Sequence, residues 1–344
     1  MKSSLILLLF SVIAIKSIAQ ETQIKGFNDI QVGNLNPAGS PATHGFMVGQ
    51  FDLFITSRIN DHTSFLGETV FEWDPATNTW SLDLERAIVR YSFSDLANIS
   101  AGKFHTPFGY WNNAYHHGSL IQPTIQRPNI VRFEDEGGFL PIHQVGAQLD
   151  GSGISDLHIG YNLLLSNGQS QGNSGGGYVY NSSMAVSWAV SMEPVDGFKV
   201  IASGHDNYIP AGSTTYQGVL LPEDSHYKMN NLSVAYFLGS LPFEICVEYY
   251  NIANSMATSG TTNLGGFFGY VGFTKFKIIP YVVYNNIRFQ SAEKFFVKND
   301  LDGFTGGLRY SVSAKAVLKL EFTRETTQLV GKQDLLRVQF AIGF

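Results

Sequence analysis

The feature that most constrains this chain is an apolar composition without long apolar runs. Hydrophobic residues make up 44% of the sequence and charged residues 15%, against about 25% charged residues in typical globular domains. After residue 20, no stretch reaches the roughly 18 consecutive apolar residues of a membrane-spanning helix. Apolar residues instead recur at every second position, which is the period of a β-strand with one apolar face. This pattern favours an all-β fold, a transmembrane antiparallel β-barrel whose strands face lipid on one side and a polar lumen on the other.

About sixteen segments follow this period, with turn residues between them. The alternation is clearest in residues 46–59, 157–166, 184–192 and 243–250. The other expected strands cover roughly residues 22–33, 64–74, 79–93, 96–108, 143–151, 197–206, 226–238, 263–273, 276–286, 303–312, 315–324 and 336–344.

One expected strand changes parity along its length. In residues 79–93, Trp80 and Leu84 share one parity, whereas Val89 and Phe93 share the other. The shift predicts either a β-bulge near Glu85 or an upper part of the strand that lies above the membrane.

The connections between the expected strands alternate between short and mostly longer ones. Tight periplasmic turns and longer external loops are typical of outer-membrane barrels. We therefore expect one barrel domain over residues 20–344, without a plug domain or a linker. The expected external loops are 34–43, 75–78, 109–142, 167–182, 206–225, 252–262, 287–302 and 325–333.

The N-terminus has the pattern of an export signal. Lys2 precedes an apolar run, and small residues follow before Gln20. We expect residues 1–19 to be a cleaved signal peptide; the alternative, a membrane anchor, fits less well because Lys16 interrupts a run too short to span. Cys246 is the single cysteine, so no intramolecular disulfide is expected, and the net charge of −6 gives no reason to expect a nucleic-acid partner.

The chain ends on an aromatic residue within a strand pattern. Leu336, Val338, Phe340, Ile342 and Phe344 share one parity. This ending resembles the C-terminal signature of outer-membrane β-barrel proteins, which the barrel assembly machinery is understood to recognise. The resemblance implies that the last strand closes on the first. It also implies that Phe344 is an assembly signal and lies in the aromatic girdle at the periplasmic interface of the outer membrane.

A second resemblance lies in the stretch GKFHTPFGYW, residues 102–111. It is similar to the G-[KRQ]-F-x-x-P-F-G motif of Gram-negative porins of the phosphate-selective porin type. The resemblance implies a sixteen-stranded porin in the outer membrane, a homotrimer, and an inward-folded third external loop. Phosphate is not carried over, because the lysine and arginine ligands of that family cannot be matched residue by residue.

The segment 109–142 is the longest expected connection and is rich in apolar residues, which need a surface on which to bury. We expect it to fold into the lumen and constrict the pore; the alternative is a loop packed over the barrel mouth or against a trimer partner. The expected constriction residues are Arg127, Arg132, Glu134, Asp135 and Glu136.

The parity opposite the apolar face predicts which charged residues line the lumen. Basic residues grouped on one side of the lumen, opposite the acidic loop, would create an electric field across the pore that tunes ion selectivity. The alternative is that the water in the lumen simply solvates these charges. The expected basic residues are Arg86, Arg90, Arg309, Lys319, Arg337 and Lys25, and the acidic ones are Asp52, Glu68, Glu72, Glu244, Glu248 and Glu321.

Histidines 105, 116, 117 and 143 lie near the same loop, but they show no spacing typical of a metal site. The sequence therefore predicts no metal and no cofactor. Without a serine-elbow motif or another catalytic spacing, it also predicts no enzyme.

Two functions remain open from the sequence. The first is a porin through which small hydrophilic solutes or ions diffuse, and the many small residues of polar parity, such as Ser187, Ser203 and Ser233, favour a spacious lumen. The second is a non-conducting surface barrel that serves adhesion or assembly with a partner.

Overall fold

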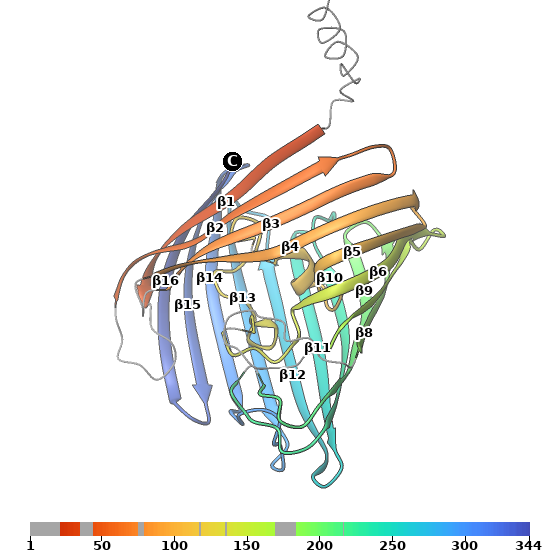
Figure 1. Ribbon diagram of the computed structural model, residues 1–344. Coiled ribbons are helices and arrows are strands. Elements are labelled where there is room, and N and C mark those ends of the chain that lie inside the picture. Colours follow the sequence, from red (N-terminus) through yellow and green to blue (C-terminus); the bar gives the residue numbers. More distant parts are fainter. Residues whose placement is uncertain are drawn as a thin grey trace, which may run out of the picture.

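The computed structural model describes residues 21–34, 44–74, 79–116, 118–134, 136–168, 184–215 and 217–344. Its strands form one closed antiparallel barrel in which each strand pairs with its sequence neighbours and β16 pairs with β1 (Figure 1). The expected fold, with sixteen strands, is confirmed. The expected signal peptide, residues 1–19, lies outside the described residues.

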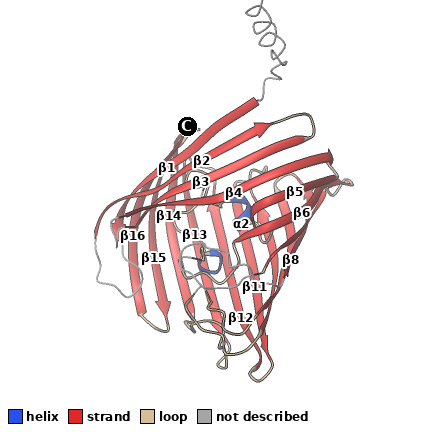
Figure 2. Cartoon of the chain, in the orientation of Figure 1, coloured by secondary structure: helices blue, strands red, loops and turns tan. Residues whose placement is uncertain are grey.

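Within the described residues, strands account for nearly all regular structure, and the two short helices found there both belong to the connection between β5 and β6 (Figure 2). None of the helices in the described ranges is long and apolar enough to cross a membrane. The elements are β1 (Glu21–Asn34), β2 (His44–Arg58), β3 (Thr63–Asp74), β4 (Thr79–Ser94), β5 (Ala97–His105), α2 (Trp111–Ala114), η1 (Asn129–Val131), β6 (His143–Ile154), β7 (Ile159–Asn167), β8 (Met184–Val195), β9 (Phe198–Ile209), β10 (Ser225–Tyr236), β11 (Phe243–Met256), β12 (Gly260–Phe273), β13 (Ile278–Phe289), β14 (Leu301–Ser313), β15 (Ala316–Thr327) and β16 (Gly331–Gly343).

Two of the expected long connections are short in the structure. β11 and β12 leave only residues 257–259 between them, and β15 and β16 leave only 328–330. The polar residues at these strand ends pair across the hairpins instead of forming loops, as in the pair Asn254 and Thr262. Polarity alone therefore overestimated the length of these two loops.

Closure of the barrel uses the last residue of the chain. The backbone N–H of Phe344 donates to the carbonyl of Gly26 at 3.0 Å, and the N–H of Gly26 donates to the carbonyl of Phe344 at 3.2 Å. The Phe344 ring stacks on Phe51 of β2, with the two ring centroids 5.9 Å apart. A closed sheet has no free edge, so its backbone groups are paired without help from water.

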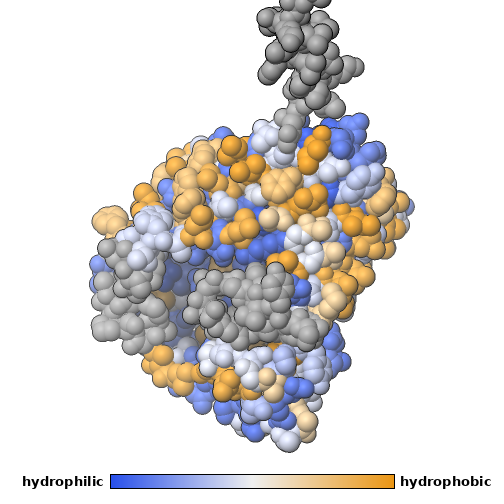
Figure 3. Space-filling view, viewed as in Figure 1, coloured by the Kyte–Doolittle hydropathy of each residue, from blue (hydrophilic) through white to orange (hydrophobic). Residues whose placement is uncertain are grey.

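The strand period separates an apolar outside from a buried inside. On β8, Met184, Trp188 and Val190 are exposed, whereas the intervening Ala185 and Ser187 are buried. Apolar side chains cover much of the outer face in the space-filling view (Figure 3). Such a surface suits lipid better than water.

The parity shift in β4 is a β-bulge, as one of the two interpretations of the sequence predicted. Glu68 of β3 pairs with Arg86, but the next residue, Thr69, pairs with Leu84, so Glu85 is the extra residue. Outside the bulge, side chains keep their alternation, and Glu85 turns into the barrel, where it is 2% exposed. The bulge therefore adds a carboxylate to the interior.

The barrel interior is less spacious than its small polar residues suggest. Ser187, Ser203 and Ser233 do face inward, but they are buried. A hydrophobic cluster that includes Tyr250 and Phe268 packs inside the barrel against the connection between β5 and β6. The core of this protein thus lies within the barrel.

Arginine at Leu163 on β7 should destabilise the barrel by about 2–4 kcal/mol if the residue lies near the bilayer midplane, because a charge would face lipid. Arginine at the neighbouring Asn162, which faces inward, should cost much less. Urea unfolding of both variants in lipid vesicles measures the difference. Ser187 is a poorer control, because its hydroxyl oxygen lies 2.7 Å from the buried Nδ1 of His205. Equal losses at positions 162 and 163 would contradict the assignment of inside and outside.

Candidate functional site: a loop bound to the inner barrel wall

Loop 3, defined here as residues 106–142, joins β5 to β6 and lies inside the barrel (Figures 1 and 2). Near its start it contacts Glu248 of β11, a side chain with no exposed surface. The Glu248 carboxylate accepts hydrogen bonds from the backbone N–H groups of Tyr110 at 3.0 Å and Trp111 at 2.6 Å. The hydroxyl of Tyr250 donates to the same carboxylate. A buried carboxylate thus supplies the acceptors that the start of α2 lacks.

Gly109 explains why the chain can approach Glu248 so closely. Its backbone has φ of +65°, a conformation that favours glycine. A Cβ atom at this position would collide with the Tyr250 hydroxyl and the Glu248 carboxylate. The last glycine of the GKFHTPFG stretch is therefore required by this contact.

A second wall carboxylate binds the middle of loop 3. Glu321 of β15 accepts hydrogen bonds from the backbone N–H groups of Ile125 at 3.0 Å and Gln126 at 3.1 Å. Because β15 and β11 lie four strands apart around the barrel, the loop is attached to two separate parts of the wall.

Polar side chains on β13 and β15 add further attachments. The Lys319 ammonium donates to the carbonyls of Ser119 at 2.6 Å and Thr124 at 3.1 Å. Asn285 Oδ1 accepts from the backbone N–H of Asn129 at 3.0 Å. These bonds satisfy loop groups that no regular secondary structure pairs.

Apolar packing completes the attachment. Trp111 is fully buried, and its ring centroid lies 5.5 Å from that of Phe268 and 5.7 Å from that of Tyr270, both on β12. Ile130 and Val131 of η1 are also buried in this cluster. The apolar residues of loop 3 therefore bury on the inner wall, as the sequence suggested they must on some surface.

Of the residues predicted to form the constriction, Arg127 holds loop 3 together internally and Arg132 contacts the wall. Arg127 Nε donates to the carbonyl of Val131 at 2.8 Å, and its guanidinium lies over the Phe133 ring, 4.2 Å from the centroid. Burial lowers the pKa of Arg127 to about 10, so it remains charged at neutral pH. Arg132 Nη2 lies 3.4 Å from Glu325 Oε1 on β15.

The predicted acidic residues of the loop have different environments. Glu134 Oε2 lies 3.2 Å from His143 Nδ1, whereas Glu136 is exposed. Asp135 lies outside the described residues. Glu134 thus faces a histidine at the start of β6 and not the arginines of the wall, which differs from the expected opposition of an acidic loop and a basic sector.

Three of the four predicted pore-lining arginines pair with an acidic residue on the wall. Arg90 donates to Asp150 at 3.1 and 2.6 Å, and Arg309 donates to both oxygens of Glu244 at 2.8 and 2.7 Å. Arg86 pairs with Glu68, which is fully buried. Pairing within the wall weakens any net field across the lumen.

The other charged residues predicted to line the lumen differ in how deeply they are buried. With the Gln126 amide turned so that its oxygen faces the guanidinium, Arg337 Nη1 donates to that oxygen at 3.0 Å, which adds another contact to loop 3. Lys319 and Asp52 are fully buried, whereas Lys25 is exposed. The sequence did not reveal which residues these charges contact, because the partners belong to different elements of the fold.

Three of the four noted histidines, His105, His116 and His143, meet Glu85 in one cluster at the base of loop 3. His117 lies outside the described residues. The sequence showed no spacing typical of metal ligands, because the four members come from β4, β5, β6 and loop 3. The parity shift at Glu85 was the one local signal that could have pointed to the cluster.

Solved structures share this architecture. The anion-selective porin from Comamonas acidovorans aligns with a TM-score of 0.68 and 11% identity, covering 94% of this chain and 100% of that chain. Salmonella typhi OmpF in complex with daunomycin aligns with a TM-score of 0.67 and 12% identity, covering 96% and 99%. The outer membrane channel DcaP of Acinetobacter baumannii aligns with a TM-score of 0.59 and 10% identity, covering 94% and 97%. No protein-family model and no curated protein matches the sequence. At these identities the likeness shows the fold.

Replacing Glu248 with alanine should loosen loop 3. The change removes the acceptor of two loop N–H groups, and each buried group left unsatisfied costs about 1–3 kcal/mol. Limited proteolysis of the folded protein in detergent micelles should then cut within the loop much faster than in the wild type. Glu136→Ala, at an exposed acid of the same loop, is the control, and equal cleavage of both variants would contradict the role of Glu248.

Proposed function

We propose that this chain is an outer-membrane porin through which small hydrophilic solutes or ions diffuse passively, with loop 3 narrowing the water-filled path. The observation that carries the proposal is the attachment of loop 3 inside the barrel at Glu248 and Glu321. A solute must pass between the loop and the remaining wall. The apolar outer surface supports a membrane location.

The path is proposed to run beside β2–β6. The hydrophobic cluster fills the side of β10–β14. On the opposite side, Asp83 and Arg90 of β4 occupy positions that face the lumen, and their side chains remain 45% and 36% exposed. Charged, partly hydrated groups favour ions and polar solutes over apolar ones.

Export, assembly and oligomerisation belong to the same proposal. Residues 1–19 would direct export, and the barrel assembly machinery would insert the chain with Phe344 as its assembly signal. A homotrimer would fit the porin resemblance, and one of the similar structures, OmpT of Vibrio cholerae, is described as a trimer form. An enzymatic activity forms no part of the proposal.

A non-conducting barrel for adhesion or assembly with a partner is the second candidate. Loop 3 contacts β11 and also reaches the cluster at β4, seven strands away in a ring of sixteen. A loop that extends across the lumen could close it. Conductance separates the two candidates.

Wild-type protein in planar bilayers should conduct, and replacing residues 119–131 with a short Gly-Ser linker should raise the single-channel conductance. The replacement removes the contacts with Lys319 and Glu321 and leaves Glu248 and its partners in place. Heat-modifiable migration in gels verifies that both proteins are folded. Folded wild-type protein without current would favour the closed barrel, and a current unchanged by the replacement would remove loop 3 from the conduction path.

Deleting Phe344 should reduce the amount of folded barrel in the outer membrane. The deletion removes two backbone hydrogen bonds at the closure and the proposed assembly signal. Phe344→Tyr, which keeps an aromatic ring and both backbone bonds, is the control. The measurement is the yield of heat-modifiable protein in the membrane fraction, and wild-type yield from the deletion would count against the assembly role.

A further inference from the structure

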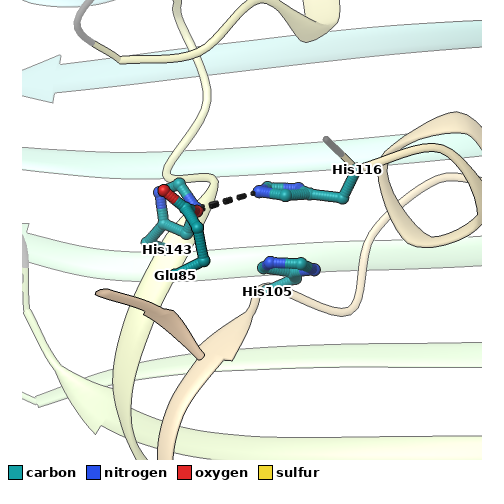
Figure 4. A group of neighbouring side chains, drawn as sticks. All are labelled: Glu85, His105, His116 and His143. Carbon is teal, nitrogen blue, oxygen red and sulfur yellow. Dashed lines mark hydrogen bonds and ion pairs between the residues drawn. The ribbon is translucent and has the colours of Figure 1, made fainter. Parts of the chain in front are cut away.

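Glu85, His105, His116 and His143 converge at the base of loop 3 (Figure 4). Each offers one ligand atom, and these four atoms all lie within 4.8 Å of one another. Glu85 and His116 are buried, and the side chain of His105 is 7% exposed. The group therefore combines three imidazoles and one carboxylate in a small, largely dry volume.

Hydrogen bonds at the far side of His116 determine where its proton lies. Arg127 Nη2 donates to Asn112 Oδ1 at 3.2 Å, and Asn112 Nδ2 donates to the carbonyl of Thr106 at 3.1 Å. Both bonds place the Asn112 oxygen toward His116 Nδ1, which lies 3.3 Å away. Because an amide oxygen only accepts, His116 carries its proton on Nδ1, and the lone pair of Nε2 faces the cluster.

His143 is held in the same way by Glu134. The Glu134 carboxylate lies 3.2 Å from His143 Nδ1 and also accepts the backbone N–H of His143 at 2.9 Å. A carboxylate on Nδ1 places a proton there, so Nε2 is the nitrogen that faces Glu85 and His116. This carboxylate–histidine pairing is the usual support of a metal-binding imidazole.

The two Nε2 atoms and the Glu85 carboxylate consequently meet at short distances. His116 Nε2 and His143 Nε2 are 2.9 Å apart, and Glu85 Oε2 lies 3.4 Å from the first and 2.5 Å from the second. Three such atoms this close need a cation among them, either a proton on His143 Nε2 or a metal ion in its place. In a tetrahedral zinc site, bonds of about 2.0–2.1 Å place ligand atoms roughly 3.3–3.4 Å apart.

His105 supplies a fourth donor. Its ring stacks on that of His116 with centroids 3.3 Å apart, and in Figure 4 the two rings lie one above the other. Within the described part of the chain its Nε2 makes no hydrogen bond, and Glu68 Oε2 lies 3.6 Å away. A buried imidazole nitrogen without a hydrogen bond is available to a ligand.

We infer that Glu85, His105, His116 and His143 form a binding site for a divalent transition-metal ion, with Zn²⁺ as the ion that suits three imidazoles and one carboxylate. Asn112 and Glu134 are positioning residues, which orient the two Nε2 atoms. The ion would join loop 3 to β4, β5 and β6. The Glu85 bulge then serves to bring the carboxylate into this site.

The test is zinc binding by the refolded full chain in detergent micelles after treatment with a chelator. Isothermal titration with zinc alone should give one ion per chain in the wild type, and His143→Gln and Glu85→Gln should lose it. Co²⁺ should give the visible absorption of a four-coordinate site in the wild type. His226→Gln is the matched control, because His226 on β10 pairs with Asp206 at 2.7 Å, away from the cluster.

Glu134→Gln separates a metal site from a packing role, because it keeps the shape of the side chain and removes its charge. We expect it to weaken zinc binding by about 10–100-fold while the barrel stays heat-modifiable. If His143→Gln does not fold, this variant still tests the site. Less than one bound zinc ion per chain in the wild type, or equal zinc binding by the wild type and Glu134→Gln, would overturn the inference. The cation of the cluster would then be a proton shared among its members.

Binding is measured without current, so its failure and the failure of the proposed porin function are distinguishable. If the chain conducts, zinc should change the single-channel conductance of the wild type and of His226→Gln but not of Glu85→Gln. A zinc effect that persists in Glu85→Gln would assign the response to another part of the molecule.

Discussion

The interior of this barrel depends on two buried wall carboxylates that bind the backbone of loop 3. A long connection with only two short helices cannot pair many of its own N–H groups, and unpaired groups are costly in a dry interior. Glu248 and Glu321 each accept two consecutive N–H groups. With the backbone satisfied in this way, the apolar side chains around Trp111 can pack on the wall instead of facing lipid or water. The size of any passage follows from this attachment.

The interior charges are arranged in local pairs. Arg90 with Asp150 and Arg309 with Glu244 neutralise each other within the wall. A field that extends across a lumen needs charges of one sign grouped on one side, and pairing removes most of it. Selectivity in the proposed channel would therefore depend on the width of the path and on single exposed groups more than on a transverse field.

The bulge in β4 connects the wall with the cluster at the base of loop 3. Strict alternation would allow inward side chains only at every second position, so consecutive inward residues need an irregularity. Glu85 is that extra residue beside Arg86, and it meets histidines from β5, β6 and loop 3. The parity shift that marks this bulge is visible in the sequence, but its histidine partners are not.

The sequence by itself predicted about sixteen strands and their alternation of an outward and an inward face, and it offered a bulge near Glu85 as one of two interpretations of the parity shift. These features are local, because a period of two acts between neighbouring residues and turn residues separate one strand from the next. Only the tertiary structure decided which groups meet inside the barrel. Trp111 and its acceptor Glu248 are 137 residues apart, and no periodicity relates them. Their meeting depends on the path of loop 3 across a closed barrel, which arises only when all the strands are paired.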